Sequence, residues 1–348
     1  MAAGLTYGLH SRRWTRPPHH FSTRQDPSDP QESPLKTTRF LLRPTTNLGF
    51  LSQTFRATRL GDSKKYILKV GTEVPQRRKW AKELHVFERE LAAYRLLAPL
   101  QGKCSPRLFC GVSANQGSDG LLLLQEIRNA RNLDQLHGLS STELTSAIRA
   151  IAHIHAYFWN SPKLKKAKGL PHHHYMRAHE VRRNLPAFLR WAKPSPRNRT
   201  LFIKLTSQVP SILARFKKRP FTLVHGDLRS DNVFFGERSV RFIDWGLSLA
   251  GNATFDLARF AGGSARKPLS LIQHVDLFSL WHRELLRRGV RNYPTHEAWS
   301  DYRDALLLTL TIPVTNGPTL AKFSHRGHKM AKVMKDRFIF AARVVNHE

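Results

Sequence analysis

The chain has 348 residues, of which 41% are hydrophobic and 24% charged. This composition is typical of a globular protein, and the length is sufficient for two domains. The longest apolar runs, such as 121–124, are far shorter than the roughly 18 residues that a membrane span requires, so no membrane span is predicted. The only two cysteines, Cys104 and Cys110, predict no disulfide framework and favour a reducing, cytoplasmic location.

The charge of the chain is strongly unbalanced. Fifty-seven Lys and Arg residues against 25 Asp and Glu residues give a formal net charge of +32. Such an excess attracts nucleotides, nucleic acid and acidic membrane surfaces. The basic residues form short scattered clusters without an aromatic-rich RNA-binding signature, so a solvated basic surface is favoured over dedicated nucleic-acid binding.

Residues 1–34 have the composition of a tail. Prolines interrupt any periodicity, and four arginines precede the first acidic residue, Asp26. A disordered basic tail and an organellar transit peptide both fit this pattern. The second interpretation would place the protein in mitochondria instead of the cytoplasm.

The segment 35–127 predicts a small β-rich lobe with one helix. Apolar residues at spacings of three and four predict the helix over 80–97, which contains Glu90. Partial alternation and flanking turn residues predict the strands. The expected strands are 49–60, 65–70, 107–112 and 121–127.

The segment 128–348 predicts a large, mostly helical lobe. Ser140 and Glu143 have the spacing of a capping box at the start of a helix with a broad apolar face. Further helices are expected at 178–192, 200–216, 272–288, 295–312 and 319–342.

The segment 221–246 interrupts these helices and carries the chemistry. It places Asp227, Asn232 and Asp244 within eighteen residues, with Gly226 allowing a tight turn before Asp227. Phosphoryl transfer needs a carboxylate that orients a hydroxyl and oxygen ligands that hold magnesium on the ATP phosphates. Arg229 can place a guanidinium on the phosphate charge that develops in the transition state. For any single residue, an Asx-rich turn between buried strands is the simpler interpretation.

These residues resemble a known family. The run 225–232 with 243–246 is similar to the catalytic and metal loops of the aminoglycoside phosphotransferase and choline kinase superfamily, which shares the protein kinase fold. The resemblance spans roughly 40–312 and is strongest to the ecdysteroid-kinase-like (CHK kinase-like) branch. The other matching segments are 87–94, 122–127, 154–159, 255–258 and 299–304.

The resemblance implies an α+β, bilobal protein-kinase-like fold and a role for each matching residue. Asp227 would be catalytic with Arg229 assisting, and Asn232 and Asp244 would be the magnesium ligands. Lys69 would contact the α- and β-phosphates and pair with Glu90. The remaining nucleotide-binding residues would be Gln125, Glu126 and Ile127 at the adenine, and Gly49 and Ser52 in a phosphate-covering loop that has one glycine instead of three.

Three further residues have structural or alternative interpretations. His225 is expected to hold the catalytic loop by hydrogen bonding, and Asp256 to brace that loop as a helix N-cap. The histidine run 172–174 with His179 allows a metal site, although a solvated or substrate-side loop is favoured.

The resemblance thus implies an ATP- and magnesium-dependent phosphotransferase that acts on a hydroxyl of a small molecule, as a monomer or dimer. Trp245 stands where protein kinases have phenylalanine, which favours small-molecule over protein substrates. The alternative is an inactive kinase-fold protein whose basic surface binds nucleic acid or anionic lipid. The only carboxylates that could form a local pocket for a polycationic acceptor are Glu284, Glu297, Asp301 and Asp304, so neutral or acidic acceptors are favoured.

Overall fold

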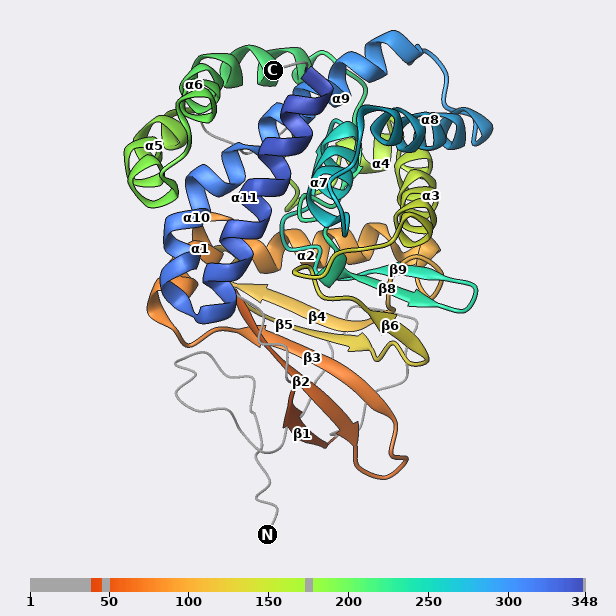
Figure 1. Ribbon diagram of the computed structural model, residues 1–348. Coiled ribbons are helices and arrows are strands. Elements are labelled where there is room, and N and C mark those ends of the chain that lie inside the picture. Colours follow the sequence, from red (N-terminus) through yellow and green to blue (C-terminus); the bar gives the residue numbers. More distant parts are fainter. Residues whose placement is uncertain (1–38, 46–50, 173–177, 347–348) are drawn as a thin grey trace. The chain divides into compact units, whose positions relative to one another are not determined.

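The computed structural model describes residues 39–45, 51–172 and 178–346 (Figure 1). The predicted tail 1–34 and Gly49 lie outside these residues. Contacts divide the chain into two compact units, one of residues 1–91 and 106–128 and the other of residues 92–105 and 129–348. The first contains an antiparallel sheet and the second is mostly helical, so the predicted α+β class is confirmed.

The sheet of the first unit has five strands in the order β1-β2-β3-β5-β4, all antiparallel to their neighbours. The predicted strands 49–60 and 65–70 are present as β2 and β3, which pair with each other as a hairpin. The edge strand β1 was not predicted, because its five residues do not alternate between apolar and polar. The bounds are β1 Phe40–Pro44, β2 Ser52–Arg59, β3 Lys65–Gly71, β4 Leu108–Ala114 and β5 Asp119–Gln125.

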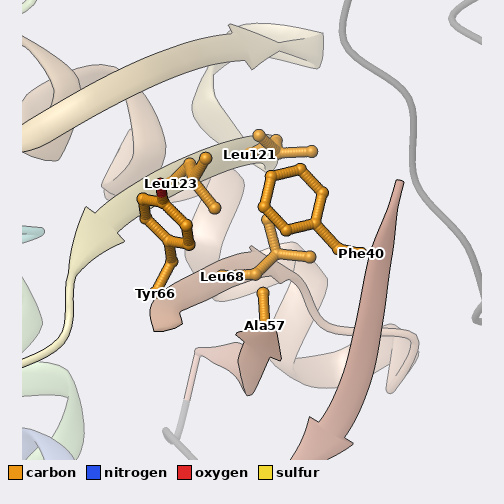
Figure 2. Close-up of a cluster of buried hydrophobic side chains, with 6 residues drawn as sticks. All are labelled: Phe40, Ala57, Tyr66, Leu68, Leu121 and Leu123. Atoms are coloured by element: carbon orange, nitrogen blue, oxygen red, sulfur yellow. The ribbon is translucent and has the colours of Figure 1, made fainter. Parts of the chain in front are cut away.

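Successive side chains of β3 point alternately into the apolar core of the sheet and to the opposite face. Tyr66 and Leu68 point into a buried cluster that Phe40, Ala57, Leu121 and Leu123 complete (Figure 2). Phe40 and Tyr66 meet edge to face, with ring centroids 5.7 Å apart. Because successive side chains of a strand alternate, Lys69 lies on the opposite face from Leu68.

The single helix predicted over 80–97 is wrong. The structure has two helices, α1 Pro75–Glu83 and α2 Val86–Leu96, which are separated at His85 with φ 52°. One left-handed residue ends a helix without disturbing the apolar periodicity, so the pattern does not reveal it.

The second unit begins its helices with α3 Ser141–Tyr157, whose predicted capping box is present. The Ser140 hydroxyl accepts from the Glu143 N–H, and the Glu143 carboxylate accepts from the Ser140 N–H at 2.8 Å. The later helices are α4 Pro162–Lys165, α5 Ala178–Ala192, α6 Pro196–Lys217, α7 Thr254–Ser264, α8 Leu271–Arg287, α9 Thr295–Thr309, α10 Thr311–Phe323 and α11 His325–Asn346.

Two of these helices differ from expectation. Helix α7 was not predicted as a full helix, because all its residues are buried and it lacks an amphipathic stripe. The segment predicted as one helix over 319–342 is divided between α10 and α11 at Ser324, which has extended backbone. Helix α7 packs against α9 and α11, and α3 packs against α8 (Figure 1).

Short strands of the second unit carry the catalytic segment. Strands β7 Thr222–Val224 and β10 Leu249–Gly251 pair with each other, and β8 Val233–Gly236 lies between β6 Ala130–Asn132 and β9 Val240–Phe242. Across the residues that the structure describes, no helix has the length and hydropathy needed to cross a membrane.

The capping box provides a test of the fold. We expect Ser140→Ala to lower the free energy of unfolding by about 1 kcal/mol, because the Glu143 N–H in the first turn of α3 loses the hydroxyl that accepts its hydrogen bond. Chemical denaturation measures the change. Ser141→Ala, at an exposed position one residue later, is the control; equal effects of the two substitutions would contradict a capping role.

Candidate active site

The catalytic loop begins with a backbone turn that requires glycine. Gly226 follows β7 with φ 77°, and a Cβ atom at this position would collide with the carbonyl oxygen of Leu247. The left-handed conformation and the close approach both exclude other residues. Asp227 follows this turn, three residues after β7 ends.

Asp227 lies at the centre of a polar cluster. Its Oδ1 accepts a hydrogen bond from Nη2 of Arg259, and its Oδ2 is 3.4 Å from Nε of Arg229. The Asn232 amide nitrogen donates to the Asp227 carbonyl at 2.9 Å and lies 3.4 Å from Oδ2. The side chain keeps 17% of its surface exposed, so it is held and still accessible.

The electrostatics of the cluster favour charged groups. Burial would raise the pKa of Asp227, but Arg259, Arg229 and further groups lower it to about 2. Burial opposes the charge on Arg229, yet Asp227, Asp231 and Asp244 raise its pKa above the ordinary value. Asp227 is therefore ionised throughout the neutral range.

Asn232 and Asp244, the predicted magnesium ligands, flank the β8–β9 hairpin: Asn232 directly precedes β8, and Asp244 comes two residues after β9. The Ile243 N–H donates to the Asn232 carbonyl at 3.0 Å, and Val233 pairs with Phe242. Asp244 follows directly with φ 62°, a left-handed conformation that Asp and Asn adopt more readily than most residues. The Asn232 carbonyl is thus bonded to the residue that precedes Asp244, and the role of the two side chains as metal ligands stays a prediction.

His225 connects the loop that carries Asp227 with the segment that precedes Asp244. Its Nε2 donates to the Ile243 carbonyl at 2.9 Å, and its Nδ1 accepts from the Asp227 N–H at 3.3 Å. Burial lowers the pKa of this fully buried ring, which favours the neutral form. The ring is therefore a structural link, as the sequence analysis expected.

Asp256 braces the same loop from inside α7. Its carboxylate accepts from the N–H groups of His225 at 2.6 Å and Gly226 at 2.9 Å. His155 Nε2 lies 3.3 Å away, and Trp281 donates to His155 Nδ1 at 3.1 Å, which leaves the His155 proton on Nε2. The expected bracing is present, but Asp256 is not the N-cap, because α7 is capped at Ala253 and Asp256 lies in its first turn.

Arg259 was missed by the sequence analysis. It lies one turn after Asp256 on α7, is only 7% exposed, and its buried Nε has no hydrogen-bond partner. The spacing of three residues from a loop-bracing aspartate was the available signal, because residues three apart share a helix face.

Lys69 and Glu90 form a buried ion pair in the first unit. Nζ of Lys69 is 2.7 Å from Oε2 of Glu90, and the two side chains are 7% and 0% exposed. Lys69 pairs with Leu122 in the β3–β5 ladder, and Glu90 lies on α2. Removing either partner would leave an uncompensated buried charge, so each side chain holds the other in place.

The other predicted nucleotide-binding residues lie at strand ends of the first unit. Ser52 is buried at the start of β2, and Gln125 ends β5, where its N–H donates to the Arg107 carbonyl at 2.8 Å. Glu126 follows and pairs with Arg56 at 2.5 Å and Arg128 at 3.0 Å, so its side chain is engaged at the surface. Ile127 comes next along the chain.

The four carboxylates considered for a polycationic acceptor are all engaged with arginine. Glu297 and Asp301 pair with Arg219 at 2.8 and 3.0 Å, and Asp304 pairs with Arg215 at 2.6 Å. Glu284 lies 3.1 Å from Arg287 and 3.8 Å from Arg288. Asp301 is also buried, with Tyr293 and Asn252 donating to it.

The histidine run does not form a metal cluster within the described part of the chain. His173 and His174 lie outside it, and His172 forms a β-bridge with Ala250. Among the residues with described positions, no group of three or more His, Cys, Asp or Glu side chains could hold a metal ion.

Comparison with known proteins identifies the family. The model of the phosphotransferase enzyme family matches residues 47–296, and the chain belongs to this family. The prediction of a kinase is therefore confirmed, while the narrower ecdysteroid-kinase-like branch stays a prediction. No curated protein sequence matches that of the chain.

Solved structures share the fold at low sequence identity. The microcompartment-associated aminopropanol kinase is similar with a TM-score of 0.56 and 14% identity, over 88% of this chain and 93% of that chain. Amicoumacin kinase in complex with AMP-PNP, Ca²⁺ and Ami is similar with a TM-score of 0.54 and 12% identity, over 87% of this chain and 88% of that chain. Choline kinase from Cryptosporidium parvum is similar with a TM-score of 0.53 and 13% identity, over 88% of this chain and 87% of that chain. The predicted kinase-like fold is confirmed.

The low pKa of Asp227 has a consequence for stability. Because about 2 lies below the ordinary value of 3.8, ionised Asp227 stabilises the fold above pH 4, and this contribution is lost as the pH falls towards 2. We expect the difference in unfolding free energy between the wild type and Asp227→Asn to be about 1 kcal/mol smaller at pH 3 than at pH 7.

Denaturant titrations at the two pH values measure this difference. Glu237→Gln, which removes an exposed carboxylate from the β8–β9 hairpin, controls for the loss of one negative charge. A difference for Asp227→Asn that does not change with pH would contradict the stabilised carboxylate.

Proposed function

We propose that the protein is an ATP- and magnesium-dependent phosphotransferase that moves the γ-phosphoryl group to a hydroxyl of a small molecule. The observation that carries the proposal is the placement of Asp227 after the turn at Gly226, with the Asn232 amide donating to its carbonyl and the Asn232 carbonyl accepting from Ile243, the residue before Asp244. Family membership supports phosphoryl transfer, and the amicoumacin kinase of the same fold was solved with AMP-PNP and a divalent cation.

The first unit supplies nucleotide contacts. The buried ion pair with Glu90 fixes the Lys69 ammonium, which is suited to contact the α- and β-phosphates. The backbone of Gln125, Glu126 and Ile127 receives the adenine, and Ser52 lies where the chain enters β2. A fixed cation contributes more than a mobile one, because it needs no reorganisation during the reaction.

The donor set of the hairpin fits magnesium. The Asn232 amide nitrogen is directed at Asp227, so its Oδ1 is the atom suited to a metal, and Asp244 adds a carboxylate oxygen. Magnesium prefers oxygen ligands and takes one or two protein ligands together with substrate phosphates. When bound, it neutralises the charge on the transferring phosphate.

Asp227 orients the acceptor hydroxyl. Its accessible carboxylate accepts the hydroxyl hydrogen bond, while Arg229 and Arg259 hold it in place. A carboxylate with a pKa of about 2 is a weak base, so its main contribution is the position of the attacking oxygen, with the proton leaving late in the transfer. Arg229, beside Asp227, adds positive charge near the reacting phosphate.

The acceptor carries no strong positive charge. A polycationic acceptor would have to displace arginine from Glu284, Glu297, Asp301 or Asp304. These four carboxylates face Arg215, Arg219, Arg287 and Arg288, so the group is electrically balanced. Neutral or acidic hydroxyl compounds need no such displacement.

The metal assignment is tested at Asp244. We expect Asp244→Asn to weaken magnesium-dependent nucleotide binding at least tenfold and turnover at least about a hundredfold, because a charged ligand is lost while the left-handed backbone is still accommodated. Calorimetry with AMP-PNP, with and without Mg²⁺, and ADP release from ATP measure the two effects.

Glu237→Gln also converts a carboxylate to an amide, at an exposed position of the same hairpin, and should leave nucleotide binding and turnover unchanged. Nucleotide binding that is independent of magnesium in wild type and variant would refute the metal site. Absence of turnover against every acceptor, with nucleic-acid affinity that falls steeply with salt, would favour the inactive, surface-binding alternative.

The acceptor class is tested with matched hydroxyl compounds. In a screen with ADP release as readout, we expect glucose or glucuronate to outperform glucosamine, and the uncharged carbon isostere of choline to outperform choline. A preference for the cationic members of such sets by tenfold or more in kcat/KM would contradict the proposed acceptor class.

A further inference from the structure

The C-terminal helix contacts the catalytic loop from outside the segment that matches the family model. Helix α11 begins at His325, whereas the match ends at residue 296. Two of its arginines, Arg326 and Arg337, reach the segment 134–136, which in turn contacts the catalytic loop.

Arg337 fixes α11 to the protein interior. Its guanidinium donates to the carbonyl groups of Gln135 at 2.7 Å, Gly263 at 3.0 Å and Leu136 at 3.2 Å. Phe338 packs so closely on Gly263 of α7 that a Cβ atom there would lie 2.7 Å from the ring. Helix α11 therefore has a defined position relative to α7.

Gln135 connects α7 to the catalytic loop through hydrogen bonds. Its fully buried side chain accepts from the Ser230 N–H at 2.8 Å and the Ser230 hydroxyl at 2.6 Å, and it donates to the Gly263 carbonyl at 2.6 Å. Its own N–H donates to Oδ1 of Asp231 at 2.8 Å.

Arg326, which is half exposed, also contacts Asp231. Its guanidinium pairs with both oxygens of Asp134, at 2.6 and 3.0 Å, and lies 3.4 Å from Oδ1 of Asp231. The other Asp231 oxygen accepts from Arg229. Asp231 is thus held on one side by Arg326 and Gln135 and holds Arg229 on the other.

The result is an alternating row of charges that includes the reacting carboxylate, Asp227. Asp134, Arg326, Asp231, Arg229, Asp227 and Arg259 follow one another, each within ion-pair distance of the next. Each arginine after Asp134 lies between two carboxylates, except Arg259 at the end. A displacement of Arg326 therefore changes the field and position of Arg229, which lies beside Asp227.

We propose that Arg326 is a positioning residue for phosphoryl transfer, acting through Asp231 on Arg229 and Asp227. The proposal rests on the proposed roles of Asp227 and Arg229. Arg326 is half exposed, and exposed ion pairs contribute little to stability. A small misplacement at the reacting groups, in contrast, is costly for rate.

Arg326→Gln is the test. We expect kcat for transfer to the best acceptor of the screen to fall about tenfold, while the KM for ATP stays within twofold. The melting temperature should change by no more than about 3 °C. Arg326→Lys, which keeps a cation near Asp231, should recover most of the rate.

Two comparisons distinguish a positioning role of Arg326 from a general effect of removing a cation from α11. Lys329→Gln removes an exposed cation from the same helix and should leave kcat unchanged. In the Asp231→Asn background, Arg326→Gln should cause no further loss, because the two residues act in series. Additive losses would overturn the proposed route through Asp231.

Hydrogen exchange provides a readout that does not need turnover. Amides of 229–232 should exchange faster in Arg326→Gln than in the wild type or Lys329→Gln. Unchanged exchange together with an unchanged kcat would overturn the inference. A wild-type protein without turnover, whose loop is nonetheless loosened by Arg326→Gln, would refute the proposed function and leave the loop contact established.

Discussion

The site depends on one buried carboxylate. Asp256 is fully buried and ionised, and burying a charge is costly unless hydrogen bonds compensate it. Burial tends to raise its pKa, but the hydrogen bond from His155, the backbone N–H of His225 and nearby charge lower it below the ordinary value. Because two of its three partners are backbone groups of the catalytic loop, this compensation also fixes the turn at Gly226 and the direction of Asp227.

The electrostatic environment of Asp227 separates two roles that one carboxylate often combines. Two arginines make it a good acceptor of a hydrogen bond and a poor acceptor of a proton. Such a group suits phosphoryl transfer, in which little covalent chemistry is required of the protein and geometry matters most. Arginines also pair with carboxylates of α8 and α9, so part of the strongly basic composition is neutralised locally.

The segment that carries the proposed site residues was easier to recognise in the sequence than the helices around it. Asp227, Asn232 and Asp244 are close in the chain, so one turn and one hairpin suffice to bring them together, and local patterns describe both. Arg259 and Arg326 were missed because their partners lie 32 and 95 residues away, and a single sequence does not show such pairings. Helix α7 was missed for a related reason, since burial on all faces removes the apolar stripe. The break at His85 depends on one backbone angle, which the apolar pattern does not encode.

Trp245 has a consequence for inhibition and control. The indole is fully buried, donates to the Phe242 carbonyl at 3.2 Å and lies against His225 with ring centroids 4.5 Å apart. In protein kinases the aromatic residue at this position sets active and inactive states. Exposing a ring of this size would cost about 4–6 kcal/mol from its apolar surface alone. Burial of Trp245 therefore opposes displacement of the 243–246 segment, and we expect compounds that require this segment to move to bind poorly.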